Sequence, residues 1–360
     1  MWHGRRSGER RVRAERGTGG DSATAAARHI ERVEWRAAEG DWRRLARGGD
    51  VFSSPEWAAL WWQHHGRGEP IVYVVRRAGR VVAVVPLYED WGVLRFVGSP
   101  HADRLGPVCE DVATGAWALE EIARRRRRLV LADRLPGEAG WQHHLVGGQR
   151  LACEASPRLV LTGSHAAWLQ AQGAATRREI RRRERRLLEQ GAIFRRLEAE
   201  EAVTTGVDVL LGLHALRWGS ASTVDGDFTR AEVRLAARNG WLRLWLVEVQ
   251  GEPVAASLGL RYHGREYLSV TGRDPAWTRA SAGSALLHHT VRDAFAGGVT
   301  EYHLLRGDQE YKARYANADD GVHSWAVGAA PMTWMARAAI AAVRRGPTAI
   351  RHAAYSHYGL

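Results

Sequence analysis

The sequence predicts an α/β fold of two similar domains, each with a mixed, largely antiparallel sheet flanked by helices. Its 360 residues, 45% of them hydrophobic, suit two domains of ordinary size. Three small residues of the first half recur in the second half at one constant offset. The recurring pairs are Gly79 with Gly251, Ala83 with Ala255, and Gly92 with Gly264. Because the glycines fall at expected hairpin turns, each half predicts a three-stranded meander.

In the first half, ordered structure is expected to begin near Ile30. Ser53 and Ser54 can cap a helix that has Pro55 in its first turn. Strands are expected at 71–76, 80–87, 93–97 and 129–132, and helices at 113–127 and 138–147.

The second half follows a basic helix at 174–190. The long helix at 282–295 and a short helical turn near 311–312 are its main features after the meander. Further helices are expected at 200–217 and 228–239, and strands at 193–197, 241–249, 253–262, 266–272, 301–304 and 322–327.

The formal net charge of +12 favours anionic partners such as nucleic acid, anionic lipid or phosphorylated cofactors. Compositional drift is the alternative, because all but one of the 52 basic residues are arginine. No apolar run has membrane-spanning length, and the N-terminus does not resemble a secretory signal. We therefore expect a cytoplasmic protein with two reduced cysteines and no metal site.

Three segments carry much of this charge. Residues 1–28 are expected to form a disordered basic tail. The helix at 174–190 presents arginines beside a narrow apolar stripe, which fits either a solvated face or an anion-binding face. Residues 331–360 predict an amphipathic basic helix, either docked on the fold or in peripheral contact with an anionic membrane.

The start of the helix at 282–295 is the predicted cofactor site. Ala282, Gly283 and Ser284 are small, and a helix start offers free N–H groups and positive dipole density for a pyrophosphate. The first half has the polar loop 99–107 at the corresponding place. We therefore expect a nucleotide cofactor to bind in the second half.

Several motifs resemble the BioF-like acetyltransferases of the GNAT superfamily, also named for cellulose-biosynthesis-type proteins, and the related Fem-type peptidoglycan aminoacyltransferases. The resemblance covers about residues 42–325, and its most specific motif is Leu305–Lys312. The other motifs are Phe52–Trp57, Val85–Leu87, Leu187–Gly191, His214–Trp218, Gly251–Ala256, Thr271–Pro275 and Gly283.

The resemblance implies tandem GNAT-like domains, a degenerate one at 29–165 and an acyltransferase domain at 166–330. In GNAT enzymes an Arg/Gln-x-x-Gly-x-Gly/Ala loop wraps the CoA pyrophosphate, and residues 279–284 match it loosely, with Ala282 at the first glycine position. The cofactor-binding residues implied are Thr271, Gly272, Arg279, Ser281, Ala282, Gly283 and Ser284. The donor would be acetyl-CoA or another acyl-CoA. Fem-type relatives instead take an aminoacyl group from tRNA, which the basic helix would suit.

Acyl transfer needs a bound donor, a nucleophile, oxyanion stabilisation and a proton for the leaving group. By the resemblance, backbone N–H groups near 269–272 would meet the oxyanion. Lys312 is the only lysine and is expected to stabilise developing negative charge, because lysine is a compact charge that can lose its proton when buried. Asp308 would orient it or the acceptor from the same helical face, with an exposed ion pair as the alternative.

Three further residues are candidates for the site. Tyr311 is a candidate proton donor, with a packed aromatic ring as the alternative. Arg217 and Trp218 are candidates to line the acceptor cleft, with ordinary packing as the alternative.

The sequence thus predicts an acyltransferase of the N-acetyltransferase type, acting on an amine or hydroxyl of a cell-envelope or polysaccharide-related acceptor. One alternative is an aminoacyl-tRNA-dependent Fem-like transferase, and another is a non-catalytic binding protein on the same fold. Its expected location is the cytoplasm, with peripheral contact at the inner face of the membrane as an extension.

Overall fold

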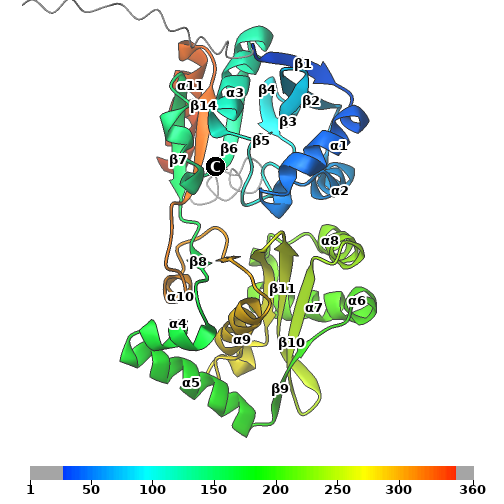
Figure 1. The fold of residues 1–360 in the computed structure, drawn as a ribbon. Coiled ribbons are helices and arrows are strands. Elements are labelled where there is room, and N and C mark those ends of the chain that lie inside the picture. The colour runs from blue at the N-terminus through cyan, green and yellow to red at the C-terminus, as the bar shows by residue number, and fades with distance from the viewer. Residues whose placement is uncertain (1–26, 346–360) are drawn as a thin grey trace, which may run out of the picture.

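Two β-sheets, each with helices packed against it, form two lobes (Figure 1). The computed structural model describes residues 27–345. Most of the predicted basic tail at 1–28, and the end of the predicted C-terminal helix at 331–360, lie outside the described residues. The mixed α/β class with two helix-flanked sheets is confirmed.

The first lobe holds an eight-stranded sheet in the order β1-β2-β3-β4-β6-β14-β7, with β5 paired to β3. Its strands are β1 (His29–Val33), β2 (Pro70–Arg77), β3 (Arg80–Asp90), β4 (Val93–Phe96), β5 (Val108–Cys109), β6 (Leu129–Pro136), β7 (Gly148–Glu154) and β14 (Val322–Val327). Its helices are α1 (Trp35–Ala46), α2 (Pro55–His65), α3 (Val112–Arg126) and α11 (Ala330–Arg345).

The second lobe holds a six-stranded sheet in the order β8-β13-β12-β11-β10-β9. Its strands are β8 (Arg158–Val160), β9 (Ala192–Arg196), β10 (Leu242–Val249), β11 (Glu252–Tyr262), β12 (Arg265–Arg273) and β13 (Glu301–His303). Its helices are α4 (His165–Ala171), α5 (Ala174–Glu189), α6 (Ala199–Glu201), α7 (Val207–Trp218), α8 (Gly226–Arg238), α9 (Ala282–Ala296) and α10 (Glu310–Ala313).

The repeated glycines occupy equivalent hairpin turns in the two lobes. Gly79 and Gly251 have φ of 78° and 84°, and Gly92 and Gly264 have φ of 78° and 81°. The residue before each glycine also has positive φ. Two successive positive φ values suit a turn that follows the right-handed twist of the strands, and glycine adopts them at little steric cost. The spacing of these glycines therefore reflects one hairpin geometry used in both lobes.

The predicted start of α2 is confirmed. The Ser54 hydroxyl accepts a hydrogen bond from the Trp57 N–H, and Pro55 stands in the first turn. The helix predicted at 138–147 is wrong, because the structure has only two short 3₁₀ turns there, separated by Gly140 at a φ of 76°. The helix predicted at 200–217 is interrupted by a π-helical turn at Ala202–Gly206, before α7 begins.

Two strands join the lobe opposite to the one predicted from their place in the chain. β14 lies within the predicted second domain at 166–330, yet it pairs between β6 and β7 of the first sheet. β8 lies within the predicted first domain at 29–165, yet it pairs with β13 of the second sheet. The chain therefore crosses to the second lobe between β7 and β8 and returns between α10 and β14, so two backbone segments connect the lobes (Figure 1).

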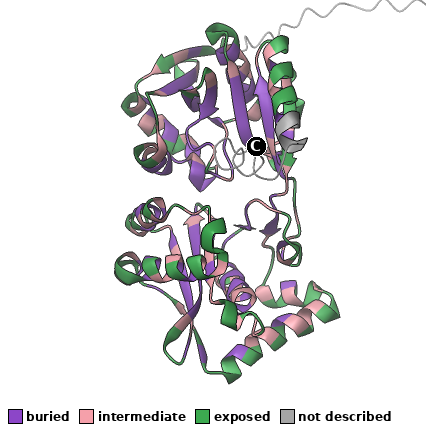
Figure 2. Cartoon of the chain, turned by 180° about the vertical axis from the view of Figure 1, so that it is seen from behind, coloured by how far each residue is buried: buried purple, intermediate pink, exposed green. Residues whose placement is uncertain are grey.

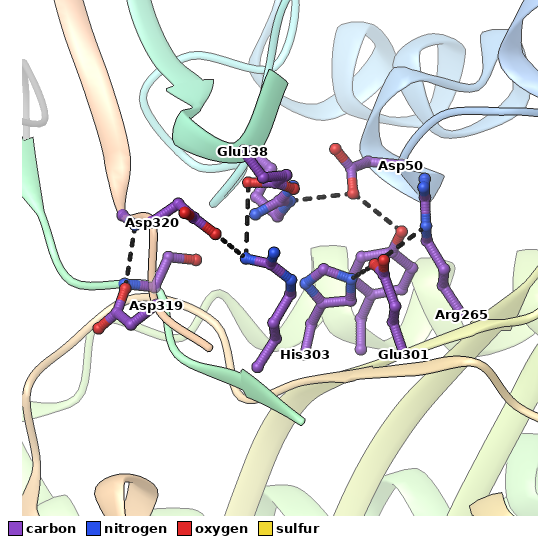
Figure 3. Close-up of polar contacts among 12 residues, drawn as sticks. Asp50, Glu138, Arg265, Glu301, His303, Asp319 and Asp320 are labelled. Atoms are coloured by element: carbon purple, nitrogen blue, oxygen red, sulfur yellow. Dashed lines mark hydrogen bonds and ion pairs between the residues drawn. The ribbon is translucent and has the colours of Figure 1, made fainter. Parts of the chain in front are cut away.

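Buried charges join the lobes (Figure 3). Asp50 of the first lobe accepts hydrogen bonds of 2.9 Å from Arg104 and from the hydroxyl of Tyr267 on β12. His303 of β13 stacks on the Tyr267 ring and bonds Glu301 at 2.9 Å. The hydrogen bond from Tyr267 to the buried Asp50 carboxylate crosses between the lobes, and it resists their separation because its loss removes one of the hydrogen bonds that satisfy this carboxylate.

Burial follows the sheets (Figure 2). The central strands of both lobes are mostly buried, whereas α5 shows exposed residues along most of its length. Within residues 27–345, no helix has both the length and the apolar character required to cross a membrane.

Candidate acyl-donor site

The second sheet opens into a wedge between two parallel strands. β12 pairs with β13 through Arg265, Glu266 and Tyr267 only, and then runs on to Arg273. β13 ends at His303, so the later part of β12 has no strand beside it on that edge among the described residues. Such an edge leaves backbone N–H and C=O groups available for other partners.

A β-bulge marks the point where the wedge begins. Leu258 of β11 pairs with Val270, whereas the next residue, Gly259, pairs with Leu268. Ser269 is therefore an extra residue without a partner on β11. Bulges redirect neighbouring groups and are common next to active sites.

A cavity of about 230 Å³ lies in this wedge, at the start of α9. It is lined by residues from β11, β12, α7, α9 and α10, with no aspartate or glutamate among them. The lining residues are Arg217, Ala256, Ser257, Leu268, Thr271, Gly272, Arg273, Thr278, Ser281, Ala282, Gly283, Ser284, Leu286, Leu287 and Tyr311.

The start of α9 gives the cavity a positive end. Ser281 has a φ of 60° and its side chain does not cap the helix. The first backbone N–H groups of a helix lack intrahelical acceptors, and the dipole adds positive charge there. Two arginines, Arg217 and Arg273, line the same cavity. A wall with cations, helix N–H groups and no carboxylate is suited to a phosphate-bearing ligand.

The electrostatics of Arg217 agree with an anion site. Burial lowers the pKa of Arg217, and the nearby Arg273 guanidinium lowers that pKa further. The only hydrogen bond of Arg217 in the described structure is a long one, 3.4 Å from its Nη1 to Thr271 Oγ1. A bound anion between the two guanidinium groups would remove this repulsion.

One buried hydroxyl group of the wall has no hydrogen-bond partner among residues 27–345. Ser257 Oγ on β11 is buried and lines the cavity, although the sequence analysis did not single it out. In the sequence, Ser257 stands out only as a hydroxyl-bearing residue within an otherwise apolar strand. Tyr311 also lines the cavity, and burial raises the pKa of its phenol, so it remains protonated at neutral pH. Buried polar groups without partners are uncommon and suggest a missing ligand or water.

Gly272 has a packing role that the sequence did not reveal. A Cβ atom at this position would lie 2.5 Å from the backbone nitrogen of His214 and 2.8 Å from the carbonyl oxygen of Leu210. The glycine therefore lets α7 lie directly against β12. His214 extends this contact, because its ring nitrogens lie 2.9 Å from the Thr271 carbonyl and 3.1 Å from the Ser222 hydroxyl.

The structure brings together most of the site residues predicted from the sequence. Eight of them line the cavity: Arg217, Thr271, Gly272, Ser281, Ala282, Gly283, Ser284 and Tyr311. The other four do not line it: Arg279, Trp218, Asp308 and Lys312. Arg279 is exposed, and Trp218 lies beneath the Arg217 guanidinium at 4.6 Å.

Lys312 points away from this cavity. Its ammonium donates a 3.2 Å hydrogen bond to the Leu305 carbonyl and a second one to the Arg306 carbonyl. Lys312 and Asp308 line a separate cavity of about 410 Å³. Burial lowers the pKa of Lys312 to about 8. Because α10 begins only at Glu310, Asp308 does not share a helical face with Lys312 as the sequence predicted.

The first lobe has buried polar pairs at the corresponding strands. β4 and β6 pair from Val93 to Arg95, and the buried Arg95 bonds Asp133 at 2.8 Å. The Ser99 hydroxyl donates to the same carboxylate at 2.5 Å. Carboxylate and guanidinium groups therefore satisfy one another there, whereas the wall of the donor cavity holds arginines and no carboxylate.

Comparisons with known proteins agree with this geometry. Residues 174–313 match the family described as the acetyltransferase (GNAT) domain. No curated protein sequence matches the chain. The fold is similar to the crystal structure of FemX, with a TM-score of 0.61 and 11% identity over 86% of this chain and 99% of that one.

Two further solved structures share the fold as well. The C-terminal domain of a lysylphosphatidylglycerol synthetase from Agrobacterium fabrum has a TM-score of 0.56 and 10% identity, covering 85% of this chain and 97% of that one. The structure of L-PGS from Bacillus licheniformis has a TM-score of 0.51 and 11% identity, covering 78% and 95%. Residues 174–313 therefore match the GNAT acetyltransferase domain, and the chain as a whole shares its fold with FemX and with these two structures.

Proposed function

We propose that this protein transfers an acyl group from acyl-CoA to an amine or hydroxyl acceptor. The observation that carries the proposal is the cavity at the start of α9, which joins a helix N-terminus with two arginines and excludes carboxylates. Phosphates of a nucleotide-bearing donor suit that wall. Its 230 Å³ is less than the roughly 300–1,000 Å³ of pockets for drug-sized ligands, so it would enclose only part of a molecule as large as CoA.

The chemistry would occur along the open edge of β12. Backbone N–H groups on this edge are candidates to stabilise the oxyanion that forms when the acceptor attacks the donor carbonyl. Tyr311 is the candidate proton donor for the departing thiolate, because its phenol is protonated and lines the cavity. For Lys312 we propose a positioning role, since its ammonium binds the 305–306 backbone next to α10.

The acceptor is proposed to belong to the cell envelope or to a polysaccharide. The resemblance to BioF-like acetyltransferases and the fold shared with FemX support this choice. Peripheral contact with an anionic membrane is proposed for α11, which exposes Trp334 and Met335 beside Arg337.

Calorimetric titration of acetyl-CoA into the full chain tests the donor. Arg273→Ala is expected to weaken binding about tenfold to a hundredfold, the effect of removing one charge-assisted hydrogen bond. Arg238→Ala is the matched control, because this exposed arginine of α8 lies outside the cavity. Equal losses in both variants, or no binding by the wild type, would contradict the proposed site.

A second candidate donor is aminoacyl-tRNA. The observation that favours it is the exposed arginine face of α5, where Arg178, Arg181 and Arg186 form no ion pair within the described structure. Stabilisation by tRNA without stabilisation by acetyl-CoA would select this donor. Stabilisation by neither would favour a non-catalytic binding protein.

A further inference from the structure

The first lobe has its own cavity of about 380 Å³, which shares no residue with the donor cavity. It lies between the end of α2, the end of β3, the β3–β4 hairpin and the loop after β4. Its lining residues are Trp61, His64, His65, Gly66, Arg67, Tyr88, Asp90, Trp91, Ser99, Pro100 and His101.

Aromatic rings dominate this wall, and one of them is presented to solvent. Trp91 is 89% exposed and has a φ of 50°, in the turn before Gly92. The positive φ belongs to the hairpin geometry that all four turns share, but the exposure of the indole does not, because an indole left in water gains no burial free energy. Trp61 is a buried part of the wall, and the Tyr88 ring packs against both Trp61 and Trp62. The cavity wall therefore contains buried aromatic rings together with one solvent-exposed aromatic ring.

The polar groups of the wall are mostly uncharged. Burial lowers the pKa of His101 to about 4 and also lowers the pKa of His65. The two imidazole rings are stacked, with their centroids 4.0 Å apart. Two positively charged imidazolium rings would repel each other at this distance. Arg67 and Asp90 contribute one charge of each sign. In the donor cavity, by contrast, the charged lining residues are both arginines. A wall with one charge of each sign does not favour a phosphate.

Neutral imidazole rings can form hydrogen bonds with the hydroxyl groups of a ligand. The Trp61 indole donates to His101 Nδ1 at 3.0 Å, so in the neutral ring the proton is on Nε2, which can donate to a ligand. His65 Nε2 is buried 4.0 Å from Asp225, so His65 contributes its ring to the wall, stacked on His101, rather than a hydrogen bond to a ligand. A sugar hydroxyl both donates and accepts, and the C–H face of a sugar ring packs on an indole.

We infer that this cavity binds a neutral glycosyl unit, with Trp91 covering one face of the ring and His101 bonding its hydroxyls. The inference rests on the proposed function for its meaning: the glycosyl unit would belong to the acceptor. The segment 219–225 contacts both sites from behind their walls. Ser222 bonds His214, which also bonds the Thr271 carbonyl of the donor cavity, and Asp225 lies 4.0 Å from His65.

The test is calorimetric titration of the full chain, without donor, using cellotetraose, chitotetraose and maltotetraose. Binding of at least one is expected, and Trp91→Ala should weaken it about fivefold to tenfold, the effect of losing one aromatic stacking contact. Trp334→Ala is the matched control, because this tryptophan is 73% exposed and lies on α11 outside the cavity. It should leave the affinity unchanged, and both variants should melt like the wild type.

Three results would overturn the inference: no binding of any of the three sugars at several millimolar, equal losses for Trp91→Ala and Trp334→Ala, or tighter binding of uridine diphosphate than of every sugar. The acetyl-CoA titration keeps the two hypotheses apart. Sugar binding without acetyl-CoA binding would support the glycosyl site and contradict the acyl-CoA proposal. Acetyl-CoA binding without sugar binding would contradict the glycosyl site alone.

Discussion

Lys312→Met distinguishes a positioning role from a catalytic one. The side chain is only 5% exposed, and its ammonium donates to the carbonyls of Leu305 and Arg306. These carbonyls belong to a segment in which Leu305 and Gly307 both have positive φ. Methionine has a similar volume, so the substitution removes the donor without creating a large cavity.

The expected loss follows from the two carbonyls. Each buried acceptor left without a partner costs about 1–3 kcal/mol. Part of this cost is offset because methionine does not require the desolvation of a charge. We therefore expect Lys312→Met to lower the free energy of unfolding by about 2–4 kcal/mol at pH 7, which corresponds to a drop in Tm of about 5 °C or more.

The pH dependence of the free energy of unfolding should show the contribution of this lysine. Its pKa in the folded protein is about 8, below the ordinary 10.5. Between these values the unfolded chain binds more protons, so the contribution of Lys312 to stability rises with pH, by about 3 kcal/mol in all. The difference in stability between wild type and Lys312→Met should therefore grow from pH 7 to pH 10.

Urea unfolding at several pH values measures the stability, and NMR measures the pKa directly. Because Lys312 is the only lysine, protein labelled with ε-¹³C-lysine shows one side-chain signal, whose titration midpoint is expected near pH 8. A variant that melts within 1 °C of the wild type but has lost acyl transfer would refute the positioning role and restore a catalytic one.

Two further substitutions test the packing around the donor cavity. Gly272→Ala should lower the free energy of unfolding by about 3 kcal/mol or more in urea unfolding, because the new Cβ meets the backbone of α7. Gly212→Ala, with open space around it, should raise the free energy of unfolding by about 0.5–1 kcal/mol. Similar values for both variants would exclude close packing as the reason for Gly272. Glu232→Gln should flatten the pH dependence of stability. Glu232 is 4% exposed, burial raises its pKa, and it bonds Trp57 at 2.8 Å. The folded protein therefore holds a proton that the unfolded chain has lost, and stability falls as pH rises above the ordinary pKa of 4.5. Parallel stability curves for wild type and Glu232→Gln between pH 5 and pH 8 would contradict this sign.

Local preferences along the chain were sufficient for many of the elements and for much of the donor cavity, although not for the 3₁₀ turns at 137–143 or the π-helical turn at Ala202–Gly206. The glycines at 79, 92, 251 and 264 predict their turns because positive φ is a property of the residue and its neighbours. The same holds for the start of α2 at Ser54 and for the small residues at the start of α9. These features need no knowledge of distant contacts.

Contacts between distant residues decided the rest. β14 joins the first sheet and β8 the second, because a strand pairs with an available edge regardless of its position in the chain. Lys312 lies next to the predicted proton donor in sequence, yet its ammonium binds two carbonyls outside the donor cavity. Glu232 bonds Trp57 of the other lobe across 175 positions. Periodicity and spacing record which residues share a face, whereas the direction of one side chain depends on which groups the folded chain brings within reach.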